Sequence, residues 1–356
     1  MKMAIDPREI SQVRYNMERR AMNAYADRTD MRQGLMDASY RHYLNEIESK
    51  INNDFLRYAT REGITIQEAR KRAQAMDVRA FADRARQAVQ DKDFSDKTNE
   101  WLKVYNLKMR VSREELLKYN IQLELYNLNK ETENIIVTGM DDEYRREIER
   151  QSGILGNSVP TNIGERVEQL IDADFYGNSF SEKIWGANGK YELIEAEVFK
   201  ALSDIQGNVG DYRSGVRKLR DAFGVSKSDA YRLMRTETRR MNATASMDMY
   251  KEEGFTHYIY IAEPGACLHC AALDNTAIPI GEEIPGYNYP TMHPNCRCSS
   301  YGVIRLVKAD TGLSNIDEHN SEYGTYEDAL KDIEDILNGK ITKHEELRNK
   351  SKEYAL

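Results

Sequence analysis

The chain has 356 residues, of which 40% are hydrophobic and 31% are charged, and its formal net charge is −8. A chain of this length buries at least one sizeable core and is expected to fold as two or three units. The charge excludes a general nucleic-acid binder, which would be basic over a whole face or domain. The sequence shows neither a signal-peptide pattern nor a run of about eighteen apolar residues, so we expect no membrane segment and a reducing cytoplasm.

Residues 1–110 are predicted to be helical with short breaks. One apolar stripe at spacings of three and four residues indicates a helix packed on a neighbour, and it comprises Tyr40, Tyr43, Leu44, Ile47, Ile51, Phe55 and Tyr58. Thr65 with Glu68, and Ser112 with Glu115, have the spacing of a capping box, which starts a helix by satisfying free backbone N–H groups. The second box precedes another buried stripe of Leu117, Ile121, Leu125 and Leu128.

The later part of the chain changes character twice. Residues 153–164 combine Gly, Asn, Ser and Pro and predict a loop, after which the pattern is helical again. Residues 255–262 and 301–307 are β-branched and aromatic and predict two strands. Two strands alone are marginal in water, so we expect another source of stability between them. Residues 309–356 are acidic, and residues 325–339 within them predict one short helix.

All 4 cysteines lie between the two predicted strands. Cys267 and Cys270 form C-x-x-C, a spacing that lets both sulfurs reach one ion from a tight turn. Cys296 and Cys298 are two residues apart, so in extended chain both point to the same side while Arg297 faces away. This arrangement directs two thiol pairs toward one point.

His293 lies three residues before the second pair and adds an imidazole on the same loop. Two pairs of such ligands suit a tetrahedral, structural Zn²⁺ site with no open position. The candidate ligands are Cys267, Cys270, His293, Cys296 and Cys298. The spacing leaves open whether the four cysteines bind, or three of them with His293. His269, inside the C-x-x-C, is expected to face solvent or to support a ligand. A zinc ion would then stabilise a β unit that has little core of its own.

Two other interpretations of the cysteines stay open, namely redox or disulfide chemistry and inert buried thiols. A thioredoxin-type pair opens a helix after a strand in a βαβ unit, whereas the residues after Cys270 are interpreted as loop. Disulfides suit a secreted protein, and the sequence shows no signal for secretion.

Glu237 lies on the apolar face of a predicted helix, where a carboxylate costs free energy unless it is paired. One interpretation is a structural carboxylate that accepts hydrogen bonds from a neighbouring segment or pairs with Arg235 or Arg239. The alternative is a general base in a DNA-acting enzyme or effector that also uses the metal module. The structural interpretation is favoured because no nucleophile or phosphate loop accompanies Glu237. No catalytic or cofactor-binding residue is therefore assigned.

Together these segments resemble the phage head-morphogenesis or minor capsid protein family, the Mu protein F-like group, over about residues 110–305. The motifs that carry the resemblance are Arg235-Thr236-Glu237, Cys267 and Cys270, Leu273-Asp274-Asn275, and His293-Pro294-Asn295-Cys296-Arg297-Cys298. Asn275 stands where Gly is common in that group, and both residues suit a turn with positive φ.

The resemblance implies a low-copy virion component without enzymatic activity, with room for several copies in one virion. Such a protein binds near the portal vertex inside the head during procapsid assembly and assists genome packaging or delivery. Its expected partners are the portal protein and the capsid interior, and contact with packaged DNA is expected to be weak and local. Before assembly it would reside in the host cytoplasm.

The expected fold is mainly α, an extended multi-helix architecture with a small C-terminal α+β unit stapled by zinc. Its expected parts, in chain order, are an N-terminal helical region (1–110), a helical head-morphogenesis domain (111–250), a β-containing Cys/His zinc module (251–308) and an acidic tail (309–356).

Overall fold

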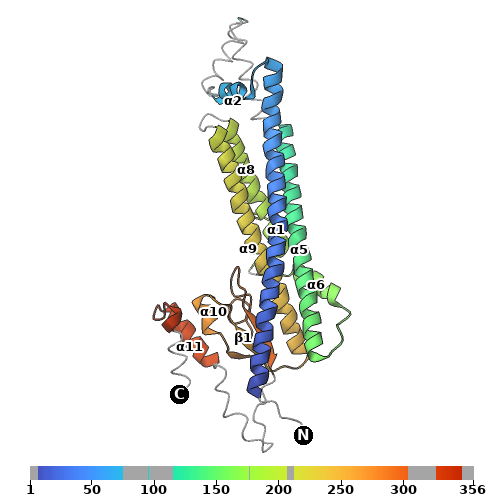
Figure 1. Ribbon diagram of the computed structural model, residues 1–356, viewed down its shortest axis with the longest axis vertical. Coiled ribbons are helices and arrows are strands. Elements are labelled where there is room, and N and C mark those ends of the chain that lie inside the picture. Colours follow the sequence, from blue (N-terminus) through green and yellow to red (C-terminus); the bar gives the residue numbers. More distant parts are fainter. Residues whose placement is uncertain are drawn as a thin grey trace, which may run out of the picture. The chain divides into compact units, whose positions relative to one another are not determined.

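The computed structural model of the protein is mainly helical, with one small sheet near its C-terminal end (Figure 1). The residues that it describes are 7–74, 95, 115–175, 177–206, 212–303 and 326–346. The helices are α1 (Pro7–Glu62), α2 (Ile66–Gln74), α5 (Glu115–Leu155), α6 (Ile163–Asp172), α7 (Phe180–Trp185), α8 (Lys190–Gln206), α9 (Tyr212–Glu252), α10 (Leu268–Ala272) and α11 (Tyr326–Leu337). The strands are β1 (His257–Ile261), β2 (Ala277–Pro279) and β3 (Ser299–Val303). This confirms the predicted fold class. Within the described residues, no helix combines the length and the apolar character that crossing a bilayer requires.

Helix α1 runs without interruption for 56 residues, and a short break at residues 63–65 separates it from α2, as the capping box at Thr65 predicts. Pro7 occupies the first helical position, where its missing N–H costs nothing, and no proline follows it within the helix. Gly34 is the one glycine in the helix, and a glycine there costs only about 1 kcal/mol relative to alanine. The helix therefore continues through the position at which a break is most expected.

The chain divides into two compact units, and α1, α5 and α9 contribute residues to both. Unit 1 comprises Met1–Arg32, Ile136–Ala173 and Arg232–Leu356, and unit 2 comprises Gln33–Ile135 and Asp174–Tyr231. Every cysteine lies in unit 1. The predicted division into four consecutive parts stays a prediction.

Unit 2 is built around the predicted apolar stripes. Its core side chains on α1 and α5 are Tyr40, Ile47, Ile51, Phe55, Ile121, Leu125 and Leu128, all buried, whereas Tyr43 and Leu44 are half-buried. The side chains of Tyr58 and Leu117 lie outside the described set. Thr65 Oγ1 accepts a hydrogen bond from Glu68 N at 3.1 Å, as the first predicted capping box requires. The second box, at Ser112, falls outside the described residues. A further box, Ser179 with Glu182, starts α7 and was not predicted.

Buried ion pairs join α1 and α5 within unit 1. Arg28 and Arg32 both donate to Glu143, at 2.6 and 2.7 Å, and Arg150 donates to Glu18 at 2.8 Å. The carboxylates of Glu143 and Glu18 are almost completely buried. Because residue numbers rise along α1 as they fall along α5, the two helices run antiparallel here. The predicted loop at residues 153–164 follows, shortened because α5 continues to Leu155.

The sheet has the order β2-β1-β3, and both pairings are antiparallel. The first predicted strand, 255–262, is confirmed as β1. The second, 301–307, is confirmed over its first three residues as the end of β3, which begins earlier, at Ser299, and residues 304–307 fall outside the described residues. Strand β2 was not predicted, because its segment was interpreted as loop from the sequence. Tyr258 lies opposite Ile278 on one side and Gly302 on the other. With antiparallel neighbours on both sides, the sheet contains no βαβ unit.

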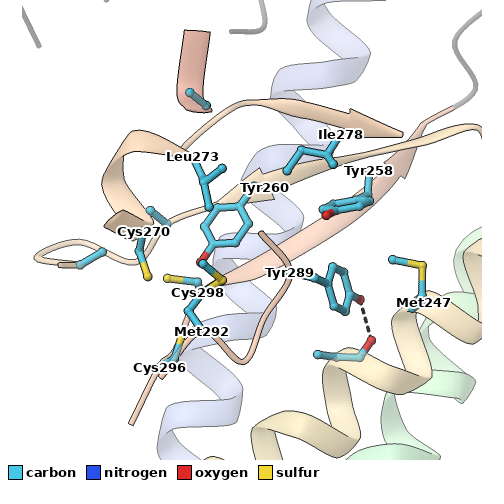
Figure 2. Close-up of a cluster of buried hydrophobic side chains, with 14 of the residues drawn as sticks. Met247, Tyr258, Tyr260, Cys270, Leu273, Ile278, Tyr289, Met292, Cys296 and Cys298 are labelled. Carbon is cyan, nitrogen blue, oxygen red and sulfur yellow. Dashed lines mark hydrogen bonds between the residues drawn. The ribbon is translucent and has the colours of Figure 1, made fainter. Parts of the chain in front are cut away.

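Strand β1 is buried on both faces. Tyr258 and Tyr260 lie on one face in a cluster with Tyr289 and Leu273 (Figure 2). Tyr250 of α9 belongs to the same cluster. The opposite face packs on α1, in a smaller cluster of Met22, Ile259, Ile261, Ala277 and Tyr301. Helix α11, the short helix predicted in the acidic tail, adds Ala329 and Ile333 to the first cluster. The expectation of a β unit with little core is therefore wrong, because helices from distant parts of the sequence complete its core.

Candidate metal centre

The first cysteine pair follows strand β1. Gly265, with φ of 83°, provides the predicted tight turn. Cys267 is the N-cap of α10, and Cys270 lies inside that helix. The C-x-x-C therefore opens a five-residue helix, which corrects the interpretation of this segment as loop. The Cys267 residue is exposed, and Cys270 is buried.

The second cysteine pair lies on the loop that leads into β3. Asn295 adopts a positive φ of 65°, and Cys296 N donates to the carbonyl of His293 at 3.0 Å, which closes a tight turn. Cys296 and Cys298 are both buried, whereas the side chain of Arg297 is 40% exposed. The predicted sidedness of this segment is therefore confirmed.

The two segments meet, and the five candidate ligands form two groups that share Cys270. In the first group, the sulfurs of Cys267 and Cys270 and a ring nitrogen of His293 all lie within 4.8 Å of one another. In the second group, the sulfurs of Cys270, Cys296 and Cys298 also lie within 4.8 Å of one another. His293 Nε2 is 3.5 Å from both Cys267 Sγ and Cys270 Sγ. All four cysteines are free thiols, so this cluster could hold a metal ion.

Hydrogen bonding among the sulfurs favours thiolates at two positions. The bond from Cys270 lowers the pKa of Cys267 to about 5 and that of Cys296 to about 2. The same bonds raise the pKa of Cys270, which keeps its proton. The thiolate is the form of cysteine that binds metals, so part of the cluster is already in the binding form at neutral pH.

Helix α9 holds the second cysteine loop by its R-T-E segment. Thr236 Oγ1 accepts a hydrogen bond from Asn295 N at 3.3 Å. Arg239 Nε donates to the carbonyl of Cys298 at 2.8 Å, and its Nη2 donates to the same oxygen. Tyr289 Oη in turn donates to a carbonyl of α9 at 2.6 Å. The helix motif and the H-P-N-C-R-C motif therefore form one structural element. Sequence reasoning missed this role of Arg239, although its place beside the R-T-E motif was a signal.

The L-D-N motif turns the chain from α10 into β2. Asp274 Oδ1 accepts a hydrogen bond from Ala262 N at 2.7 Å, which ties the turn to the end of β1. Asn275 has a φ of 59°, as its place in the motif predicts, and its N–H donates to the carbonyl of Tyr260 at 2.8 Å. These contacts fix the distance between the first cysteine pair and the sheet.

Glu237 is buried and paired, as the structural interpretation expects, and Arg240 is one of its partners. Its side chain is 1% exposed, and Arg240 Nε donates to it at 2.8 Å. Arg240 also donates to the carbonyl of Leu170 at 3.0 Å. A carboxylate so buried and paired offers no access to a substrate.

His269 belongs to neither group of candidate ligands. Its Nε2 lies 2.8 Å from the carbonyl oxygen of Tyr287, and its ring contacts the Tyr287 ring edge-on. It therefore joins α10 to the loop before β3.

Comparison with known protein families supports the assignment of these motifs. Residues 196–301 match the family model described as Phage Mu protein F like protein, which confirms the resemblance over that segment. The matched residues include the R-T-E segment of α9 and both cysteine pairs. No curated protein and no solved structure matches the chain.

Proposed function

Since residues 196–301 fall in the phage Mu protein F-like family, we propose that this protein is a minor capsid protein that acts in phage head morphogenesis. The observation that supports the proposal is that two motifs within the matched segment, on α9 and on the loop before β3, contact each other. Thr236 and Arg239 of α9 bind the backbone of Asn295 and Cys298, so the motifs of the family support each other directly. In this proposal residues 111–250 form the head-morphogenesis domain and residues 251–308 form the zinc module.

The cluster of thiols and imidazole is proposed to bind one structural Zn²⁺. Zinc–sulfur bonds of about 2.3 Å place two sulfurs about 3.8 Å apart in a tetrahedron. The donors of each group lie within 4.8 Å of one another, so small shifts bring them to that spacing. The cluster offers at least four protein ligands, enough to fill a tetrahedral site without an open position, which fits a structural ion.

Metal analysis of the purified protein tests the zinc site. We expect one zinc ion per chain, and its loss in a Cys270→Ser variant, because Cys270 belongs to both groups of donors. A His293→Ala variant distinguishes the ligand sets. It weakens zinc binding if three cysteines and His293 are the ligands, and leaves it unchanged if the four cysteines are. Absence of zinc from the native protein would overturn the site.

The proposed place of action is the interior of the head near the portal vertex, with the portal protein as the main partner. Helix α1 supports docking through its exposed apolar side chains, since Met31 and Leu35 are 73% and 60% exposed and lie one turn apart. Such a pair on a helix surface suits packing against another protein. Contact with packaged DNA would be weak, because the net charge is −8.

Co-purification with the portal protein of the same phage tests this role. We expect the full chain to capture the portal protein, and the double variant Met31→Asp with Leu35→Asp to lose capture while keeping its helical content. An Asn45→Asp variant, also exposed on α1, serves as the control and should bind normally. Failure of the full chain to bind the portal protein, together with its absence from purified heads, would refute the proposal.

A further inference from the structure

One buried hydroxyl group lies against the cysteine cluster. Tyr260 is on β1, its side chain is 0% exposed, and its hydroxyl points toward the sulfurs (Figure 2). The cysteine side chains that interact with this hydroxyl are those of Cys298, Cys296 and Cys270. Among the described residues, no partner meets the geometry of a hydrogen bond to Tyr260 Oη. A buried hydroxyl without a hydrogen-bond partner costs free energy, so the orientation of the Tyr260 hydroxyl toward the sulfurs requires an explanation.

The other buried tyrosines of this cluster are satisfied by oxygen. Tyr258 Oη donates to the carbonyl of Asn288 at 3.2 Å, and Tyr250 Oη donates to the carbonyl of Ser300 at 2.9 Å. Tyr260 differs from them because its hydroxyl faces sulfur atoms. A protonated thiol is a weak acceptor, whereas a metal-bound thiolate carries negative charge and accepts more strongly.

We propose that Tyr260 is a positioning residue of the metal centre, whose hydroxyl donates a hydrogen bond to a metal-bound thiolate of the group Cys270, Cys296 and Cys298. The inference rests on the proposed zinc site. A tyrosine hydroxyl keeps its proton at neutral pH, so it is available as a donor. Hydrogen bonds of this kind orient a ligand and tune its bond to the metal, and their removal typically weakens metal binding about 10- to 100-fold.

The test compares Tyr260→Phe with Tyr258→Phe in the full chain. The two tyrosines lie on the same face of the same strand and are equally buried, which makes Tyr258 a matched control. Co²⁺ is the probe, because sulfur-to-cobalt charge transfer gives an absorption band that reports on the thiolates. We expect Tyr260→Phe to weaken Co²⁺ binding about 10-fold and to shift this band, because one thiolate loses its donor. Tyr258→Phe should leave both the affinity and the band unchanged.

In thermal unfolding of the metal-free variants, we expect Tyr258→Phe to have the larger effect and Tyr260→Phe the smaller one, which is the opposite of their effects on Co²⁺ binding. Tyr258→Phe removes a hydrogen bond to Asn288 and should lower the melting temperature, whereas Tyr260→Phe removes only an unpaired hydroxyl and should leave it unchanged or raise it. If Tyr260→Phe binds Co²⁺ with normal affinity and an unchanged band, the role of Tyr260 is refuted while the metal site stands. If the native protein binds neither Co²⁺ nor Zn²⁺, the metal site itself is refuted.

Discussion

Replacing Arg239 with alanine should destabilise the contact between α9 and the second cysteine loop. The side chain is 3% exposed, donates two hydrogen bonds to the carbonyl of Cys298, donates one to Asn242 Oδ1, and lies 5.4 Å from the ring centroid of Tyr25. Truncation leaves the Cys298 and Asn242 oxygens buried without this donor, at about 1–3 kcal/mol each, and removes a cation–π contact of about 0.5–2 kcal/mol. Because these contacts share one side chain they are not additive, and we expect a total loss of about 4 kcal/mol.

Urea denaturation of the metal-free protein, followed by circular dichroism, measures this loss. Arg297→Ala is the matched control, because Arg297 lies on the same loop, is 40% exposed, and approaches Glu263 only to 4.0 Å. It should change the free energy of unfolding by less than about 0.5 kcal/mol. Arg239→Lys should recover only part of the loss, because an ammonium group lacks the planar fork that reaches one carbonyl twice. A loss of under about 1 kcal/mol in Arg239→Ala would refute the role of this arginine.

Substitutions at three further positions test other contacts in unit 1. Burial alone would raise the pKa of Glu147, but the charge and hydrogen bonds of Arg150 lower it below the ordinary 4.5. The ionised Glu147 therefore stabilises the folded protein above pH 4.5, and this stabilisation is lost as the pH falls through the lower pKa of the folded state. Glu147→Gln should therefore lower the free energy of unfolding by about 3 kcal/mol at pH 7 and make it depend less on pH in acid. Urea denaturation midpoints at several pH values measure both effects, and the same dependence on pH as in the native protein would contradict this role of Glu147. Asn275→Ala should cost about 1 kcal/mol in thermal denaturation because φ is 59°, whereas Asn275→Gly should not, and equal effects would count against a strained turn. Gly302→Ala places a Cβ 2.8 Å from a ring carbon of Tyr250. It should therefore lower the free energy of unfolding, measured with urea, by about 1–3 kcal/mol. An unchanged free energy of unfolding would disprove this close packing.

Strand β1 could be predicted because its residues favour extended chain, whereas in β3 only Tyr301 and Val303 do, and its first two residues, Ser299 and Ser300, gave no such signal. Strand β1 is buried on both faces, so its sequence is an unbroken apolar and aromatic run that resembles no helix stripe. Strand β2 could not be predicted, because its three residues include Pro279 and become a strand only by pairing with β1. Helix α10 is too short for any periodicity to show.

The core of the β unit was missed because its parts are distant in sequence. Tyr250 comes from α9, Tyr260 from β1 and Tyr289 from the loop before β3, and no local pattern joins them. The partner of Glu237 is a different case. Residues three apart face each other on a helix and residues two apart do not, so the spacing already favoured Arg240 over Arg235 and Arg239. All five candidate ligands, in contrast, were identifiable from the cysteine pairs and the histidine beside them.

The ion pairs between α1 and α5 have a mechanical consequence. Sliding α1 along α5 by one turn, about 5.4 Å, would take Glu18 away from Arg150 and would leave only one of Arg28 and Arg32 within reach of Glu143. Glu18 would then keep only Arg14 of its own helix, and Glu143 would keep one arginine in place of two. Both buried carboxylates would be paired less completely at the same time, which destabilises the shifted arrangement. Purely apolar side chains would tolerate such a displacement far better. The first helix is thus held in one lengthwise alignment, and a partner that pulls on it would transmit the load to α5 without slippage.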